Sequence, residues 1–223
     1  MGQTSSFVPD GQGFAERVGA TKGLEETTSQ LVLKALDKKL LSSWLDLADS
    51  QAHDFEMGFW GGRYPEADID AVAELFNVMN TAPRDDLEME DRQTKPEQLR
   101  EMEAYEMARG VERRVLYVRH KPSQNLAGFT VTYWYPEEPE NLDQQATGVL
   151  PEYRGNRLGR WLKAAMIQKV LTERPVVKRI RTGNANSNAP MLAINTELGF
   201  KLYKSDVVWQ LEMTKLKGYL NLK

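Results

Sequence analysis

The sequence contains no cysteine and only two histidines among its 223 residues. Without cysteine there is no disulfide, no thiolate nucleophile, and no zinc or iron–sulfur site with cysteine ligands. His53 and His120 lie far apart in the chain, and neither belongs to an H-x-x-x-H or H-x-H pattern. We therefore expect no metal site and no Ser-His-Asp triad, and we interpret both histidines as ordinary surface or strand residues.

The sequence also lacks a long apolar run and a strong excess of one charge. No apolar stretch approaches the roughly 20 residues of a membrane-spanning helix, and the first residues lack the charged-then-apolar order of a signal peptide. Lys and Arg number 29 against 32 Asp and Glu, and this net charge of −3 argues against a nucleic-acid binder. We expect a cytoplasmic protein that contacts neither membrane nor nucleic acid. Met1 to Ser6 formally matches a myristoylation signal, a short pattern that often arises by chance.

The first half of the chain is predicted to be mainly helical. Its first dozen residues are polar and rich in glycine, which indicates a disordered segment or a linker. A strand is expected over 27–33, and helices over 34–50 and after Pro65, where apolar residues recur at helical spacing. A third helix should begin at the capping box Thr94-Lys95-Pro96-Glu97 and end at Gly110.

After Gly110 the apolar pattern changes from helical to alternating. The expected strands are 113–120, 126–135, 144–150, 177–182 and 206–213, and the expected helices are 158–173 and 188–197. This order of elements predicts an α/β fold, with a mixed sheet and helices on its faces.

A weak internal repeat relates the two ends of the chain. Residues 17–31 align without gaps on residues 197–211, so that glycine and a Gln-Leu pair coincide. Our hypothesis is that residues 1–50 form an N-terminal tail that is the remnant end of a preceding copy of the domain. Residues 51–82 are then a helical linker, and residues 83–223 form the main domain.

The segment from Val149 to Arg160 is the most informative part of the sequence. It combines a strand end, a short turn with glycine and the start of a helix. Free backbone N–H groups and the helix dipole attract anions at such a point. Glycine lets a ligand approach the backbone, and Arg154, Arg157 and Arg160 would attract phosphate. The segment is neither a P-loop nor a dinucleotide fingerprint, and a plain turn with solvated basic side chains is the alternative.

This segment resembles motif A of the GCN5-related N-acetyltransferases, Gln/Arg-x-x-Gly-x-Gly/Ala. Arg154 fills the first position and Gly159 the last, whereas Arg157 stands where glycine is usual. Because the family makes this contact through backbone amides, arginine can serve there if its φ is negative.

A second motif of the same family follows in the expected order. The segment Asn188 to Phe200 resembles motif B, with Met191 where alanine is usual and Asn195 where tyrosine is usual. The resemblance covers about residues 83–213 and is strongest to the branch that contains tandem-domain proteins such as mycothiol synthase.

The resemblance implies a fold with a mixed, mostly antiparallel central sheet and helices on both faces, and acetyl-CoA as the cofactor. In the family, the strand before the turn separates from its neighbour and pairs with the pantetheine arm, and the turn amides bind the pyrophosphate. Carried onto this sequence, the cofactor-binding residues are Thr147, Gly148, Val149, Arg154, Gly155, Asn156, Arg157, Leu158, Gly159, Arg160 and Asn188. No metal is implied.

Direct acetyl transfer also needs a neutral amine and a proton source for the leaving thiolate. We name Glu152 as a candidate base, with Asp143 and the acidic stretch 85–106 as alternatives. Asn195 cannot act as an acid, so we assign it to holding the thiol or a water. Tyr203 is the candidate proton donor, beside the alternatives Tyr133 and Tyr135.

The function predicted from these motifs is acetyl transfer to a primary amine of a small molecule, by direct attack in a ternary complex. A catalytically weak or inactive acyl-CoA-binding regulatory module and a protein acetyltransferase are the alternatives. We expect the acceptor between the helices at 66–110 and the strands at 126–150. The acidic and aromatic residues there, which would suit a cationic amine or form a plain solvated surface, are Trp134, Tyr135, Glu137 and Glu138. A homodimer is compatible with the resemblance.

Overall fold

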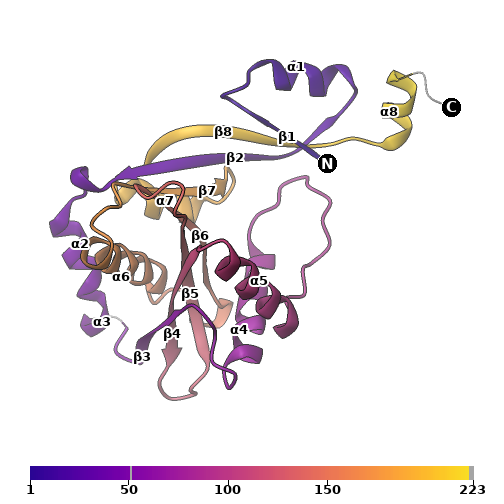
Figure 1. Cartoon of the computed structure of the whole chain (residues 1–223). Coiled ribbons are helices and arrows are strands. Elements are labelled where there is room, and N and C mark those ends of the chain that lie inside the picture. Colours follow the sequence, from indigo (N-terminus) through magenta and orange to yellow (C-terminus); the bar gives the residue numbers. More distant parts are fainter. Residues whose placement is uncertain (51, 221–223) are drawn as a thin grey trace. The chain divides into compact units, whose positions relative to one another are not determined.

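The structure is a computed structural model that describes residues 1–50 and 52–220 (Figure 1). The chain forms two compact units. The first unit comprises Met1–Gln30, Ala82–Glu90 and Gly183–Lys223, and the second comprises Leu31–Thr81 and Asp91–Thr182. Both units combine helices with mostly antiparallel strands, which confirms the predicted fold class. None of the described helices is long and apolar enough to cross a membrane.

The first unit contains three antiparallel strands in the order β1 (Gly2–Ser5), β8 (Lys201–Gln210) and β2 (Thr21–Val32, of which the last two residues lie in the second unit). Helix α1 (Asp10–Arg17) follows β1 directly. The prediction of a disordered segment or linker over the first dozen residues is therefore wrong. The reason is that β1 is an edge strand of polar residues, stabilised by backbone pairing with β8 rather than by an apolar pattern.

Two further helices complete the first unit, α7 (Ala189–Glu197) and α8 (Met213–Tyr219). The side chain of Asn188 caps α7, because its Oδ1 accepts from the backbone N–H of Met191 at 3.4 Å. Gly199 follows α7 with a φ of +89°, a left-handed conformation that glycine adopts without steric cost. The helix predicted over 188–197 is thus confirmed.

The second unit contains a five-stranded arrangement in which, among the described strands, one pair is parallel. Its order is β7 (Arg179–Ala185, of which the first four residues lie in this unit), β6 (Asn141–Val149), β5 (Leu126–Trp134), β4 (Glu112–His120) and β3 (Phe55–Gly61). Strands β6 and β7 are parallel, and the other neighbours are antiparallel.

The segment 51–82, predicted as a helical linker, contains strand β3 in addition to α4 (Ile69–Phe76) and η2 (Asn77–Thr81). Trp60, Tyr64 and Val72 of this segment are buried in the core of the second unit. Strand β3 was missed because two of its seven residues are glycine, which weakens a strand signal.

Helices cover both faces of the second unit's sheet. On β5, Phe129 and Val131 pack in the same core cluster as α4 and α5 (Pro96–Ala108), whereas the hydroxyl of Thr132 contacts the sulfur of Met166 on α6 (Leu158–Glu173). Successive strand residues point to opposite faces, so α6 lies on the face opposite α4 and α5 (Figure 1).

Two predicted helix starts in the second unit need correction. The helix predicted over 34–50 is instead η1 (Leu33–Ala35), α2 (Lys38–Leu45) and α3 (Leu47–Ser50). It is interrupted because Asp37 caps α2, accepting from the backbone N–H groups of Lys39 and Leu40 at 2.8 and 3.2 Å. The cap of α5 lies one residue later than predicted, where Gln98 Oε1 accepts from the backbone N–H of Lys95 at 3.0 Å.

Candidate functional site

Strand β6 changes its partners halfway along its length. Within the second unit, its pairing with β7 covers Asn141 to Asp143 and ends with the pair of Asp143 and Arg181. Its pairing with β5 continues to Val149, with two residues of β6 opposite one of β5 between Gln144 and Thr147. This irregularity is a β-bulge, which bends a strand and re-aims its side chains. Within the second unit, the side of β6 beyond Asp143 therefore offers backbone N–H and C=O groups to an extended ligand.

A chain of polar side chains lies along the same part of β6. Gln144 Nε2 donates to the hydroxyl of Thr130 at 2.9 Å, and that hydroxyl lies 2.8 Å from the hydroxyl of Thr147. Gln144 is 2% exposed, and its Oε1 has no hydrogen-bond partner within the described part of the chain. An unpaired buried acceptor costs about 1–3 kcal/mol. The polar chain from Gln144 to Thr147 is therefore held inside the fold, and one of its acceptors is buried without a partner among the described residues.

The turn after β6 leads into the exposed N-terminus of α6. It passes through η3 (Pro151–Tyr153) and Gly155, whose φ is +89°. Among the described residues, no side chain caps α6, and the N–H groups of Arg160 and Trp161 both bond to the carbonyl of Arg157, at 3.0 and 3.2 Å. The N–H groups at the very start of an α-helix have no acceptor inside the helix. They lie at the positive end of the helix dipole, so the turn can bind an anion.

Arg157 adopts the backbone conformation that favours glycine. Its φ is +55° and its ψ is 17°, so the condition that its φ be negative is not met. The left-handed region costs a residue other than glycine roughly 1–2 kcal/mol. The backbone at this position therefore has the left-handed conformation that glycine usually adopts. Arg157 adopts it at a cost to the stability of the protein.

The other two arginines of the turn already have partners in the second unit. Arg154 Nε donates to the carbonyl of Val149 at 3.1 Å, and its Nη2 donates to the hydroxyl of Thr81 at 2.8 Å. The guanidinium of Arg160 lies 5.4 Å from the ring centre of Trp44. Arg154 thus ties the end of β6 to η2, a structural role that the sequence did not indicate.

The predicted site residues fall into two groups. Residues 147–160, with Glu152 among them, all belong to the second unit, where Glu152 is exposed in η3. Asn188, Asn195 and Tyr203 belong to the first unit. Asn195 is buried and donates to the amide oxygen of Asn184 at 2.7 Å, and the ring of Tyr203 packs edge-on against Phe7 at 5.3 Å.

The alternative acid–base residues are also placed by the structure. Burial raises the pKa of Asp143, and this effect outweighs the opposite effect of the nearby Arg181. Burial also holds the pKa of Tyr133 well above its usual range, and its hydroxyl contacts the sulfur of Met102. Asp143 lies at the last paired position of β6 and β7 within the second unit. A carboxyl group with a raised pKa is therefore located where the pairing of these two strands ends.

Sequence reasoning missed the burial of Lys163. Its side chain lies among the buried residues of α6, is 1% exposed, and has its pKa lowered by burial to about 7. In the sequence, this lysine follows Arg160 by three residues and reads as one more basic side chain near the turn. The signal that could have found it is its place between Leu162 and Ala164, which both face the core.

No protein-family profile and no curated protein matches this chain. Solved structures do match it, and they define the class: the chain has the fold of the GCN5-related N-acetyltransferases. Two of them are members of this family from Sphaerobacter thermophilus and Kribbella flavida. They have TM-scores of 0.59 and 0.56 and are 12% and 11% identical to this chain, and each alignment covers 93% of it. The alignments cover 58% and 66% of those two proteins.

A more similar structure is a tandem protein of this family from the clavulanic acid biosynthesis pathway, at 28% identity and a TM-score of 0.71. The alignment covers 90% of this chain and 57% of the tandem protein, so the chain spans little more than half the length of that relative. The resemblance found in the motifs is confirmed at the level of the family fold.

Proposed function

We propose that this chain is an acetyl-CoA-dependent N-acetyltransferase that acts on a primary amine of a small molecule. One observation carries the proposal: within the second unit the pairing of β6 with β7 ends at Asp143, and β6 leads through a glycine turn to the start of α6, which no described side chain caps. The free strand edge suits the amide-bearing pantetheine arm, and the turn suits the pyrophosphate. Backbone groups of Thr147, Gly148 and Val149 would hold the arm, and those of 154–160 would hold the phosphates.

The chemistry requires a neutral amine as the attacking group. An alkyl ammonium of pKa ~10.4 is neutral about once in 10³ at pH 7, so a base or desolvation must supply about 4–5 kcal/mol. Bound acetyl-CoA supplies the acetyl group as a thioester. We propose Asp143 as the group that accepts the amine's proton, since burial raises its pKa and it stands at the free edge of β6. Glu152 is the other candidate base.

We keep Tyr203 as the predicted donor of the proton that the leaving thiolate needs. Asn195 and Asn188 keep their proposed roles of holding the thiol or a water and of contacting the cofactor. One observation favours the alternative of an acyl-CoA-binding module without catalysis. Asn195 stands where the family usually has tyrosine, and an amide has no proton to give at neutral pH.

Cofactor binding is tested by titrating acetyl-CoA into the protein in a calorimeter. We expect Arg157→Glu to lower the affinity at least tenfold, because it places a negative charge at the start of α6, beside the proposed phosphates. The matched control is Lys38→Glu, the same change of charge at the exposed first position of α2. Both variants place an acid in a favourable position for the helix dipole, so neither should unfold the protein. Equal affinities in the two variants would remove the turn from the cofactor site.

Catalysis is tested by measuring thiol release from acetyl-CoA over a panel of small primary amines. We expect Asp143→Asn to lower kcat at least tenfold and to leave acetyl-CoA affinity unchanged. Glu101→Gln, on the exposed face of α5, serves as the control. Tight binding without release on any amine would favour the module, and absence of binding would reject both functions.

A further inference from the structure

Strand β3 is the last strand of the second unit's sheet, and its neighbour among the described strands is β4. The N–H of Lys121 donates to the carbonyl of Asp54 at 2.8 Å, one position outside the first pair of these two strands. Successive residues of an antiparallel strand direct their backbone groups to alternate sides. The even-numbered residues of β3 therefore bond to β4, and the backbone groups of Met57, Phe59 and Gly61 point to the outer edge.

This outer edge of β3 is open within the described part of the chain. The backbone hydrogen bonds outside the strand pairs use none of the N–H and C=O groups of Met57, Phe59 and Gly61. The strand also lacks the features that commonly keep an edge from pairing: its sequence Phe-Glu-Met-Gly-Phe-Trp-Gly has no lysine and no proline, and its register with β4 contains no bulge. Phe59 is 42% exposed. Such an edge is a template for a further strand.

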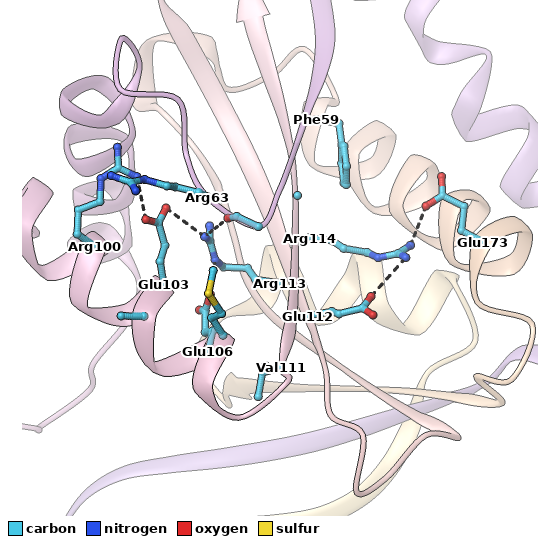
Figure 2. A pocket seen from close by; sticks show the side chains of 14 residues that line it. Phe59, Arg63, Arg100, Glu103, Glu106, Val111, Glu112, Arg113, Arg114 and Glu173 are labelled. Atoms are coloured by element: carbon cyan, nitrogen blue, oxygen red, sulfur yellow. Dashed lines mark hydrogen bonds and ion pairs between the residues drawn. The ribbon is translucent and has the colours of Figure 1, made fainter.

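The side chains of β3 lie on two faces of the sheet. Lys169 Nζ of α6 is 4.0 Å from the ring centre of Phe59, so Phe59 and Met57 lie on the α6 face. Figure 2 looks into a cavity beyond the end of β3 and shows Phe59 on the same side of the strand as Glu173 of α6. Trp60 lies on the other face, in the core cluster with α4 and α5. An added strand would thus meet two apolar side chains on the α6 face.

The open edge of β3 is complementary to itself. Its outward-facing residues lie symmetrically about Gly58, so two copies of β3 can pair antiparallel around a twofold axis at this glycine. Met57 of one copy then exchanges backbone hydrogen bonds with Phe59 of the other, and these two side chains meet on the α6 face. Glu56, the charged residue of the strand, lies opposite Trp60 of the second copy and not opposite its own equivalent.

We propose that this chain forms a homodimer in which the β3 strands of two copies pair and join the sheets of the two second units. A second copy is the partner that this edge fits, because each of the two outward apolar side chains meets the other across the axis. The strand pair is smaller than the standard interface of about 1,600 Å², so we expect a dissociation constant in the micromolar range. The proposal does not depend on acetyl transfer, because β3 contains no residue of the proposed cofactor site.

The first test is sedimentation velocity of the full chain at about 1 to 500 µM, where we expect dimer to form. Met57→Pro removes an outward N–H and keeps the bonds to β4, so it should weaken the dimer at least tenfold while the protein stays folded. The matched control is Gln3→Pro in β1, at the other end of the strand order. The N–H of Gln3 also points outward, because Thr4 and Ser6 face β8, and this variant should dimerise like the unmodified protein.

The register of the two strands is tested by cross-linking, which is specific because the chain has no cysteine of its own. Bonded residues of an antiparallel pair have Cα atoms about 5.5 Å apart, within the reach of a disulfide. Oxidation of mixed Met57→Cys and Phe59→Cys variants should give at least tenfold more covalent dimer than mixed Gln3→Cys and Phe59→Cys variants. Gly58 lies on the axis but is unsuitable, because a Cβ there would lie 2.1 Å from the ring of Tyr117.

Three outcomes overturn the proposal: a chain that stays monomeric up to about 500 µM, a dimer that Met57→Pro and Gln3→Pro weaken equally, or equal cross-linking in the two mixtures. If Met57→Pro does not fold, the cysteine variants still decide, because they introduce no proline. Acetyl-CoA titration of the unmodified protein is read separately, so a monomer that binds acetyl-CoA rejects the dimer alone.

Discussion

Lys163 gives this fold a stability that should depend on pH in a defined direction. Its pKa is lowered by burial from 10.5 to about 7, and its side chain is 1% exposed. We choose Lys163→Met as the perturbation, because methionine keeps the length of the chain and carries no charge. The observable is the free energy of unfolding of the variant minus that of the unmodified protein.

The direction of this pH dependence follows from when Lys163 binds its proton in the folded and in the unfolded chain. Above pH 10.5 both the folded and the unfolded chain hold a neutral amine, and the charge contributes nothing to the difference. As the pH falls below 10.5, the unfolded chain takes up a proton that the folded chain refuses until about pH 7. Each pH unit in this window costs the unmodified protein about 1.4 kcal/mol, and the total reaches about 5 kcal/mol at pH 7.

The assay is urea unfolding followed by tryptophan fluorescence at pH 7, 8, 9 and 10. Titration of other groups cancels in the difference between the two proteins. The advantage of Lys163→Met should grow by about 1.4 kcal/mol for each unit from pH 10 down to pH 7. Lys38→Met, at an exposed position, should show no such slope. If the two free energies of unfolding run parallel between pH 7 and pH 10, Lys163 is not held neutral by burial.

Three further predictions concern single contacts. Arg157→Gly removes a left-handed arginine and should stabilise the protein by about 1 kcal/mol, a rise in Tm of about 2–4 °C in calorimetry. Arg113→Met leaves two buried glutamates without their shared cation, and should destabilise the protein by about 3–5 kcal/mol in urea unfolding; an unchanged midpoint would refute the buried network. Gly128→Ala places a Cβ 2.7 Å from the carbonyl oxygen of Gly148, and should cost about 1–3 kcal/mol and weaken acetyl-CoA binding by displacing β6.

Most strands and helices after Gly110 were predictable because apolar residues gather in segments bounded by turn residues, such as the run from Val115 to Val118 in β4 and the buried residues Leu158, Trp161 and Leu162 of α6. Strands β1 and β3 were not predictable in the same way. The first is polar and the second contains two glycines, and both lie at an end of the strand order. Their stability comes from pairing with a neighbour that is distant in the sequence, which no local pattern records.

Some features of the candidate site could also be predicted from the sequence, and others could not. The arginines and glycines of the turn indicated an anion site from the sequence alone. The left-handed backbone at Arg157 could not be predicted, because an arginine argues against that conformation. The free edge of β6 and the unpaired acceptor of Gln144 depend on where two strands stop pairing, and this is a property of the folded chain.

The scarcity of histidine has a practical consequence for studying the turn before α6. The imidazole of His120 packs against two aromatic rings, with its ring centre 5.2 Å from that of Phe55 and 5.1 Å from that of Tyr153. His53 is 73% exposed and has no such neighbours among the described aromatic contacts. Ring currents therefore set the two imidazole signals apart in a proton NMR spectrum, without labelling. Because Tyr153 belongs to the turn itself, the His120 signal should respond to the acetyl-CoA binding that we propose there, and the His53 signal is its internal reference.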